Sequence, residues 1–214
     1  MYPFVTHTWN PIKGCKHDCV YCYVKDLAKR YGYSLEPRIV ERALKTNLGK
    51  NNFIFVGSTS DMFGVWIPAS WIGKVFEHCR KYDNKYLFQS KNPRRFFGFF
   101  DELPIKTVLG TTIETNRDYP EISKAPKVSE RVSAMFELPA RYEKMVSIEP
   151  ILDFDLHQFA SQIESIKPSF VSIGADSKGH DLPEPGGEKV KELIERLQSF
   201  TEVKIKKNLK RLSG

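Results

Sequence analysis

Three cysteines lie within eight residues near the start of the chain, at positions 15, 19 and 22, in the pattern Cys-x3-Cys-x2-Cys. Three thiolates can ligate three irons of a four-iron cluster and leave the fourth iron without a protein ligand. An iron that has an open coordination position can bind and activate a small molecule. The spacing of Cys15, Cys19 and Cys22 therefore predicts a 4Fe-4S cluster with one exchangeable position.

His17 lies between these cysteines and keeps a second hypothesis open. Together with the three thiols, its imidazole could complete the four nitrogen and sulfur ligands of a structural zinc site. Structural zinc ligands usually come as two separated pairs that join distant segments, and the sequence has no second pair. The fourth cysteine, Cys79, lies on the apolar stripe of an expected helix, where a packed core thiol is the simpler interpretation.

Length and composition indicate one globular domain over residues 1–214. Hydrophobic residues make up 41% and charged residues 28%, which argues against a disordered, collagen-like or coiled-coil chain. No apolar run approaches the roughly 20 residues of a membrane helix, and the N-terminus lacks the pattern of a signal peptide. We therefore expect a cytoplasmic protein with no membrane partner.

The charge balance favours polyanionic partners. Lysine and arginine total 33 against 26 aspartates and glutamates, a net charge of +7. Residues 204–211 hold five cations, and residues 90–100 combine Lys91 and two arginines with four phenylalanines. These segments favour a nucleotide or a nucleic-acid base as the substrate, while a solvated tail and core phenylalanines are the alternative interpretation.

Short β-rich runs alternate with helical patterns along most of the chain. The expected strands are 5–9, 53–57, 86–90, 107–112, 144–148, 170–174 and 203–206, and the expected helices are 21–31, 37–48, 69–82, 128–138, 156–166 and 188–200. Repeated βα units close into a barrel or open into a doubly wound sheet, and periodicity alone does not choose. A complete barrel takes about 250 residues, so the length favours a partial (β/α) barrel of six or seven parallel strands.

Four expected strands run directly into a carboxylate. In a barrel-like fold the loops after the strands build the active site, whereas a single acid at such a position is also a common helix cap. The glycine- and proline-rich stretch 174–187 follows another buried strand and is expected to act as a lid. The four carboxylates are Asp61, Glu114, Glu149 and Asp176.

The cysteine spacing, with Tyr21 directly before Cys22, resembles the signature of the radical S-adenosylmethionine (SAM) superfamily. In that superfamily the open iron chelates SAM, and the reduced cluster cleaves it to methionine and a 5'-deoxyadenosyl radical. The resemblance implies a 4Fe-4S cluster and SAM as cofactors, and an electron donor such as flavodoxin or ferredoxin. A closer resemblance covers nearly the whole chain: it is similar to a family of uncharacterised radical-SAM-like proteins of phages and prokaryotes through the segments TWNPIKGC, CVYCY, FVGSTSDMF, FQSKNPRR, GTTIE, SIEPIL and VSIGADS.

The resemblance also implies which residues bind SAM. The loop after the second strand meets the SAM amino group in that superfamily, polar groups after the fourth strand meet the ribose, and a nearby cation grips a carboxylate or phosphate. The expected set is Tyr21, Gly57, Ser58, Thr59, Asp61, Lys91, Thr112, Glu114 and Glu149. No residue is assigned to the chemistry on the substrate. The alternatives are a photoproduct-lyase-like DNA repair enzyme and a zinc-containing nucleic-acid-binding protein without catalysis.

Overall fold

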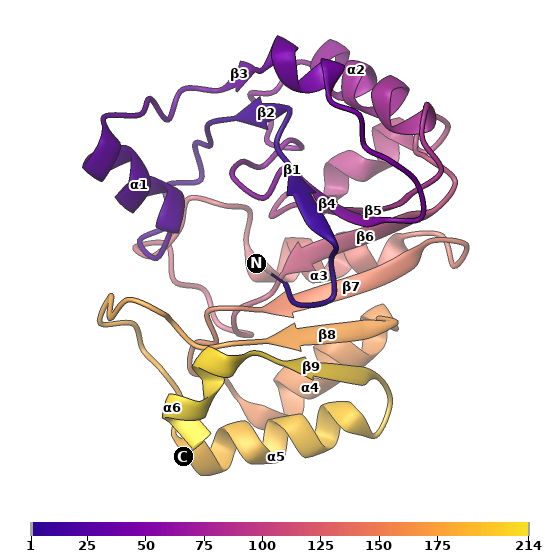
Figure 1. The fold of residues 1–214 in the computed structure, drawn as a ribbon. Helices are drawn as coiled ribbons and strands as arrows, with labels where there is room; N and C mark the ends of the chain where they lie inside the picture. Colours follow the sequence, from indigo (N-terminus) through magenta and orange to yellow (C-terminus); the bar gives the residue numbers. More distant parts are fainter. Residues whose placement is uncertain (1, 214) are drawn as a thin grey trace.

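The computed structural model describes residues 2–213, in which seven short strands pair in parallel in the order of the chain (Figure 1). The sheet curves into a half-barrel, which confirms the predicted partial (β/α) barrel of six or seven parallel strands. Its strands are β1 (His7–Trp9), β4 (Phe53–Val56), β5 (Lys85–Gln89), β6 (Thr107–Thr112), β7 (Glu143–Ile148), β8 (Phe170–Ile173) and β9 (Glu202–Ile205).

Helices follow most of the strands. They are α1 (Tyr23–Tyr31), α2 (Ala69–Arg80), α3 (Val128–Glu137), α4 (Leu156–Ile166), α5 (Gly187–Gln198) and α6 (Lys210–Ser213), with 3-10 turns η1 (Glu41–Lys45), η2 (Pro93–Phe99) and η3 (Lys207–Leu209). Figure 1 shows α2 to α5 along the outer side of the sheet and α1 on the side toward which the strands point. Within residues 2–213, no helix is both long and apolar enough to cross a membrane.

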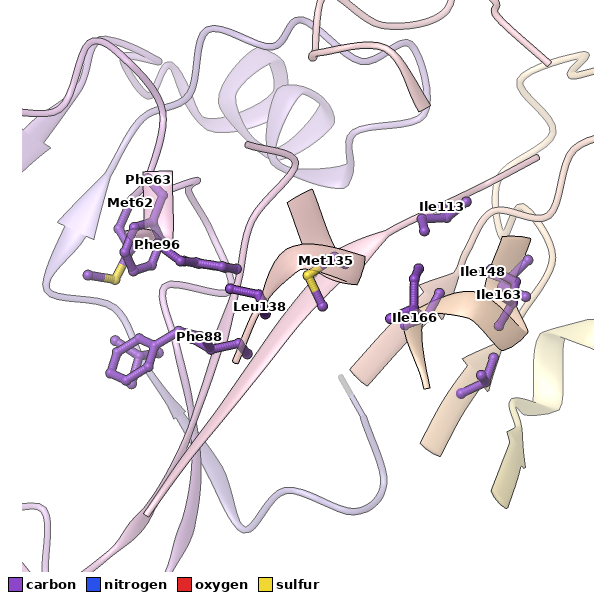
Figure 2. Close-up of a cluster of buried hydrophobic side chains, with 14 of the residues drawn as sticks. Met62, Phe63, Phe88, Phe96, Ile113, Met135, Leu138, Ile148, Ile163 and Ile166 are labelled. Atoms are coloured by element: carbon purple, nitrogen blue, oxygen red, sulfur yellow. The ribbon is translucent and has the colours of Figure 1, made fainter. Parts of the chain in front are cut away.

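The larger part of the hydrophobic core lies between the sheet and these helices. Phe88 of β5 and Val146 of β7 belong to this outer cluster, whereas their neighbours Leu87 and Met145 belong to a separate inner cluster. This alternation follows from the two-residue repeat of a strand. Figure 2 shows part of the outer core, where Phe88 and Met135 of α3 lie among other apolar side chains.

The inner cluster closes one end of the half-barrel. Tyr2 and Val5, which precede β1, pack there with Phe170 at the start of β8. Toward the carboxyl ends of the strands the inward positions become polar, as Gln89 and Ser147 show. The half-barrel therefore has an apolar end and a polar end.

The expected helix over residues 37–48 is wrong. This segment instead holds a two-residue strand, β3 (Arg38–Ile39), and the short turn η1. β3 pairs antiparallel with β2 (Ile12–Lys13), and no residue of η1 is buried. The backbone bonds to β2 and the lack of a buried apolar stripe outweigh the helical propensity of the segment. The other expected helices and strands are confirmed, with ends that shift by two residues at most.

Candidate active site

The carboxyl ends of the strands open into a cavity of about 880 Å³. Cys15, Cys19 and Cys22 all line this cavity, and all three are free thiols. Of the residues expected to bind SAM, those that line it are Tyr21, Gly57, Ser58, Thr59, Asp61, Lys91, Thr112 and Glu149. Glu114 is buried and is not among the lining residues. The structure thus brings the expected residues together, while their contacts with SAM stay predictions.

The cysteine loop, residues 15–22, is fixed at its start by a close backbone approach. The Cys15 N–H donates to the carbonyl oxygen of Leu35 at 3.1 Å. The preceding residue, Gly14, has a φ of +86°, and a Cβ atom there would lie 2.4 Å from the carbonyl oxygen of Glu36. Glycine alone permits both this backbone conformation and this proximity.

The middle of the cysteine loop pairs with the segment that precedes α3. The Val20 N–H donates to the carbonyl oxygen of Ile122 at 2.8 Å, and the Lys124 N–H donates to that of His17 at 2.7 Å. Two chain segments that are about a hundred positions apart are therefore held in a fixed register.

Asp61, which is 6% exposed, holds a side chain of the cysteine loop. His17 Nε2 lies 2.7 Å from Asp61 Oδ2. The carboxylate also accepts hydrogen bonds from the Ser90 hydroxyl and from the backbone N–H groups of Phe63 and Lys91. Burial alone would raise the pKa of Asp61, but the hydrogen bond from His17 and the other donors outweigh it and lower this pKa. An ionised carboxylate has about four acceptor positions, and these donors fill them.

Glu114 lies in a buried cluster of charges. Arg131 Nη1 lies 2.8 Å from Glu114 Oε2, and the Lys91 ammonium pairs with the other oxygen. The Tyr21 hydroxyl, from the cysteine loop, donates to the same carboxylate. Burial alone would raise the pKa of Glu114, but the positive charges of Arg131 and Lys91 outweigh it and keep this pKa well below its usual range.

Lys91 joins the two buried carboxylates. Its backbone N–H donates to Asp61 Oδ2 at 2.8 Å, and its ammonium group binds Glu114. Each carboxylate in turn holds one side chain of the cysteine loop, either His17 or Tyr21. Two acids and one lysine therefore anchor the loop that carries the thiols.

The donor set fits an iron-sulfur cluster better than a single zinc ion. In the described part of the chain, no three His, Cys, Asp or Glu side chains converge as ligands of one metal ion. A four-iron cluster has a separate iron for each thiolate, so its ligands need not meet at one atom. The zinc hypothesis also needs the His17 imidazole to meet the three thiols at one metal ion. Its Nε2 binds Asp61, and its buried Nδ1 has no hydrogen-bond partner among the described residues. Burial raises the pKa of the Cys15 thiol to about 12, so metal binding displaces a proton there.

The loop after β4 is ordered by Asn10, which sequence reasoning missed. Asn10 Oδ1 accepts hydrogen bonds at 3.0 to 3.1 Å from the Ser58 hydroxyl and from the backbone and hydroxyl of Thr59. The Tyr23 hydroxyl donates to the carbonyl oxygen of Ser58 at 2.8 Å. No sequence spacing links these positions, because only the parallel pairing of β1 with β4 brings them together.

Polar groups continue from the loops into the barrel. The Tyr2 hydroxyl lies 2.8 Å from both Gln89 Oε1 and Ser147 Oγ, and burial raises the pKa of Tyr2 far above its usual value. Lys206 Nζ lies 2.5 Å from Glu149 Oε2. Glu149 was predicted from the sequence, whereas Tyr2, Gln89 and Ser147 were missed. A polar residue at an inward position of an apolar strand, such as Gln89, was the available signal.

The stretch 174–187 reaches across to α1. Lys178 Nζ lies 2.6 Å from Asp26 Oδ2 of α1, and His180 Nδ1 lies 2.8 Å from Asp176 Oδ1. Lys178, His180 and Asp176 all line the cavity. The stretch thus lies where a lid is expected, and its movement stays a prediction.

The two basic segments contribute unequally to the cavity. In residues 90–100, Lys91 lines it, whereas Arg94 pairs with Glu137 at the surface and Arg95 donates to backbone carbonyl groups. In residues 204–211, the lining residues are Lys206, Lys207 and Asn208. The cavity is therefore bordered by cations from both segments.

Solved structures share this fold. Spore photoproduct lyase in complex with dinucleoside spore photoproduct has a TM-score of 0.68 at 13% sequence identity, over 96% of this chain and 77% of that chain. Streptococcus suis SuiB bound to S-adenosylmethionine has a TM-score of 0.58 at 11% identity, over 94% of this chain and 49% of that chain. The half-barrel is thus the same partial barrel fold as that of these two proteins.

A comparison with curated proteins gives no match. Residues 2–182 match the model of a family described as a protein of unknown function, DUF5131. The chain belongs to this family. The match includes the cysteine loop and the strand ends from β4 to β8, and it stops within the stretch 174–187.

Proposed function

We propose that this chain is a radical SAM enzyme that acts on a nucleotide or a nucleic-acid base. The observation that carries the proposal is that three free thiols line one cavity at the carboxyl ends of a parallel half-barrel. The fold that the chain shares with spore photoproduct lyase and SuiB supports it.

In this proposal Cys15, Cys19 and Cys22 would hold a 4Fe-4S cluster and would leave one iron open to SAM. When bound, the cluster supplies one electron that cleaves SAM to methionine and a 5'-deoxyadenosyl radical. An electron donor such as flavodoxin or ferredoxin completes the system.

The loop after β4 and the end of β6 are proposed to hold SAM. Gly57 has a φ of +79°, which turns the chain so that the groups of Ser58 and Thr59 border the cavity. Thr112 Oγ1 accepts a hydrogen bond from the Gln89 amide at 2.9 Å, which leaves its own hydroxyl hydrogen for a ligand.

Asp61 and Glu114 serve mainly to position the cysteine loop, because their oxygens are already bonded within the protein. The buried cluster of Tyr2, Val5 and Phe170 fills the inner end of the half-barrel. A filled inner end keeps dissolved C–H and S–H donors, which would quench a carbon radical, from entering on that side.

A nucleotide substrate is favoured by Lys207, which borders the cavity; Lys178 and Lys206 also line it but pair with Asp26 and Glu149. Phosphate groups are held by such ammonium groups. A second candidate is a repair activity on ultraviolet-damaged DNA, favoured by the extent of the fold shared with spore photoproduct lyase, 96% of this chain.

Protein that is reconstituted with iron and sulfide without oxygen, and then given SAM and dithionite, should release 5'-deoxyadenosine. The same sample without dithionite is the control, because SAM cleavage of this kind needs an electron. Absence of the product despite a full complement of iron would contradict the proposal.

A separate assay tests the repair candidate. Ultraviolet-irradiated and unirradiated oligonucleotides are each incubated with the enzyme and SAM, and a SAM-dependent change in the irradiated ones alone would favour repair.

A further inference from the structure

The buried cysteine of the loop lies beside a serine that the sequence analysis did not single out. Cys19 is 6% exposed, and its Sγ atom lies 3.1 Å from Ser123 Oγ. Cys15 and Cys22 are less buried. The Cys15 sulfur has a hydrogen bond with the backbone of His17, and within the described residues the only cysteine sulfur that is hydrogen-bonded to a hydroxyl group is that of Cys19. The three sulfur atoms therefore differ in their burial and in their hydrogen-bond partners.

Ser123 is held in this position by the backbone. The hydrogen bond from Val20 to Ile122 lies on one side of it, and the bond from Lys124 to His17 lies on the other. Both flanking bonds join the cysteine loop to the segment that carries the serine. The contact between oxygen and sulfur is therefore part of a fixed register between two segments.

The hydrogen-bond pattern of Ser123 fixes the direction of its hydroxyl. The Ala125 N–H donates to Ser123 Oγ at 3.2 Å, which occupies one acceptor position of the oxygen. A cysteine that ligates a metal is a thiolate and has no hydrogen to donate. When Cys19 ligates iron, the hydrogen bond between the two side chains must therefore run from the serine to the sulfur.

We propose that Ser123 is a positioning residue that tunes the iron-sulfur cluster: its hydroxyl donates a hydrogen bond to the ligating sulfur of Cys19 and raises the reduction potential of the cluster. This inference rests on the proposed function, because it requires a cluster on the cysteine loop. A donor to a ligating sulfur stabilises the more negative, reduced state of the cluster. Burial of the sulfur strengthens the effect.

The test compares the reduction potentials of reconstituted variants by a potentiometric titration that is monitored by EPR spectroscopy. S123A should shift the midpoint potential of the cluster to a more negative value. S123T keeps the hydroxyl and should therefore keep the wild-type midpoint potential. S165A is the matched control, since the Ser165 hydroxyl binds a backbone carbonyl oxygen of α4 at 2.7 Å, away from the cysteine loop. Resonance Raman spectra, recorded in light and in heavy water, are a second readout. One iron-sulfur band of the wild-type protein should shift with deuterium, and this shift should be absent in S123A.

The outcomes separate this inference from the proposed function. A wild-type midpoint potential in S123A at full iron occupancy would overturn the role of Ser123, and so would a lower iron content without a change in potential. Failure of the wild-type protein to bind iron would overturn the proposed function as well. A shift in S123A that S123T reverses and S165A lacks would support the inference.

Discussion

Replacing Glu114 with glutamine is expected to lower the free energy of unfolding by about 3 to 5 kcal/mol, although the two side chains have nearly the same shape. The Glu114 carboxylate is buried and neutralises Arg131 and Lys91, whose side chains are 5% and 14% exposed. Without that negative charge, both cations stay in a poorly solvated site with no opposite charge. Urea unfolding followed by circular dichroism measures the loss.

The matched control for E114Q is E137Q. Glu137 also pairs with an arginine, Arg94, but the two side chains are 43% and 52% exposed. An exposed pair of this kind contributes little to stability, because water and salt screen its charges. A loss of stability in E114Q that is no larger than the loss in E137Q would contradict the buried-charge account.

The same carboxylate gives the fold a dependence on pH. The pKa of Glu114 in the folded chain lies below its usual value of 4.5, so the ionised side chain stabilises the fold above that pH. The contribution is lost as the pH falls through the folded pKa. Asp61 acts in the same direction. The stability of E114Q should therefore decline less steeply in acid than that of the wild-type chain.

Replacing Cys22 with alanine is expected to abolish the formation of 5'-deoxyadenosine. Cys22 lines the cavity with Cys15 and Cys19, and a four-iron cluster needs all three thiolates when only three are present. The reconstituted C22A protein should hold much less iron and sulfide than the wild-type protein. Colorimetric iron and sulfide assays, together with chromatography of the nucleoside product, measure both effects.

The matched control for C22A is C79A, which removes the fourth thiol of the chain. Cys79 lies in α2 and belongs to the outer hydrophobic core, away from the cavity. C79A should keep the wild-type iron content and the wild-type yield of product. Equal loss of iron in both variants would show that the cysteine loop is not the site of the metal.

Most of the half-barrel could be predicted from the sequence, because its central strands, β5 to β8, are buried on both faces and the helices α2 to α5 each have one apolar stripe. The runs at 107–112 and 170–174 are continuously apolar or small, and both become strands. The helix expected over residues 37–48 failed because a pairing with Ile12–Lys13 decides that segment. Such a contact leaves no periodic signal in the sequence.

The candidate site was predicted in part for a similar reason. Residues within a motif, such as Cys15, or at the end of a strand, such as Glu149, follow from local sequence and line the cavity. Asn10, Ser123 and Arg131 act across long separations in the sequence, and their partners are set only by the fold. Parallel pairing and the docking of the segment before α3 bring these residues to the site.

EPR spectroscopy of the reduced, oxygen-free protein, recorded with and without SAM, tests the central claim most directly. The account predicts about four irons and four sulfides per chain, and a cluster signal that changes when SAM binds to the iron without a protein ligand. A signal that SAM does not alter, or protein that holds one zinc ion and no iron, would contradict it.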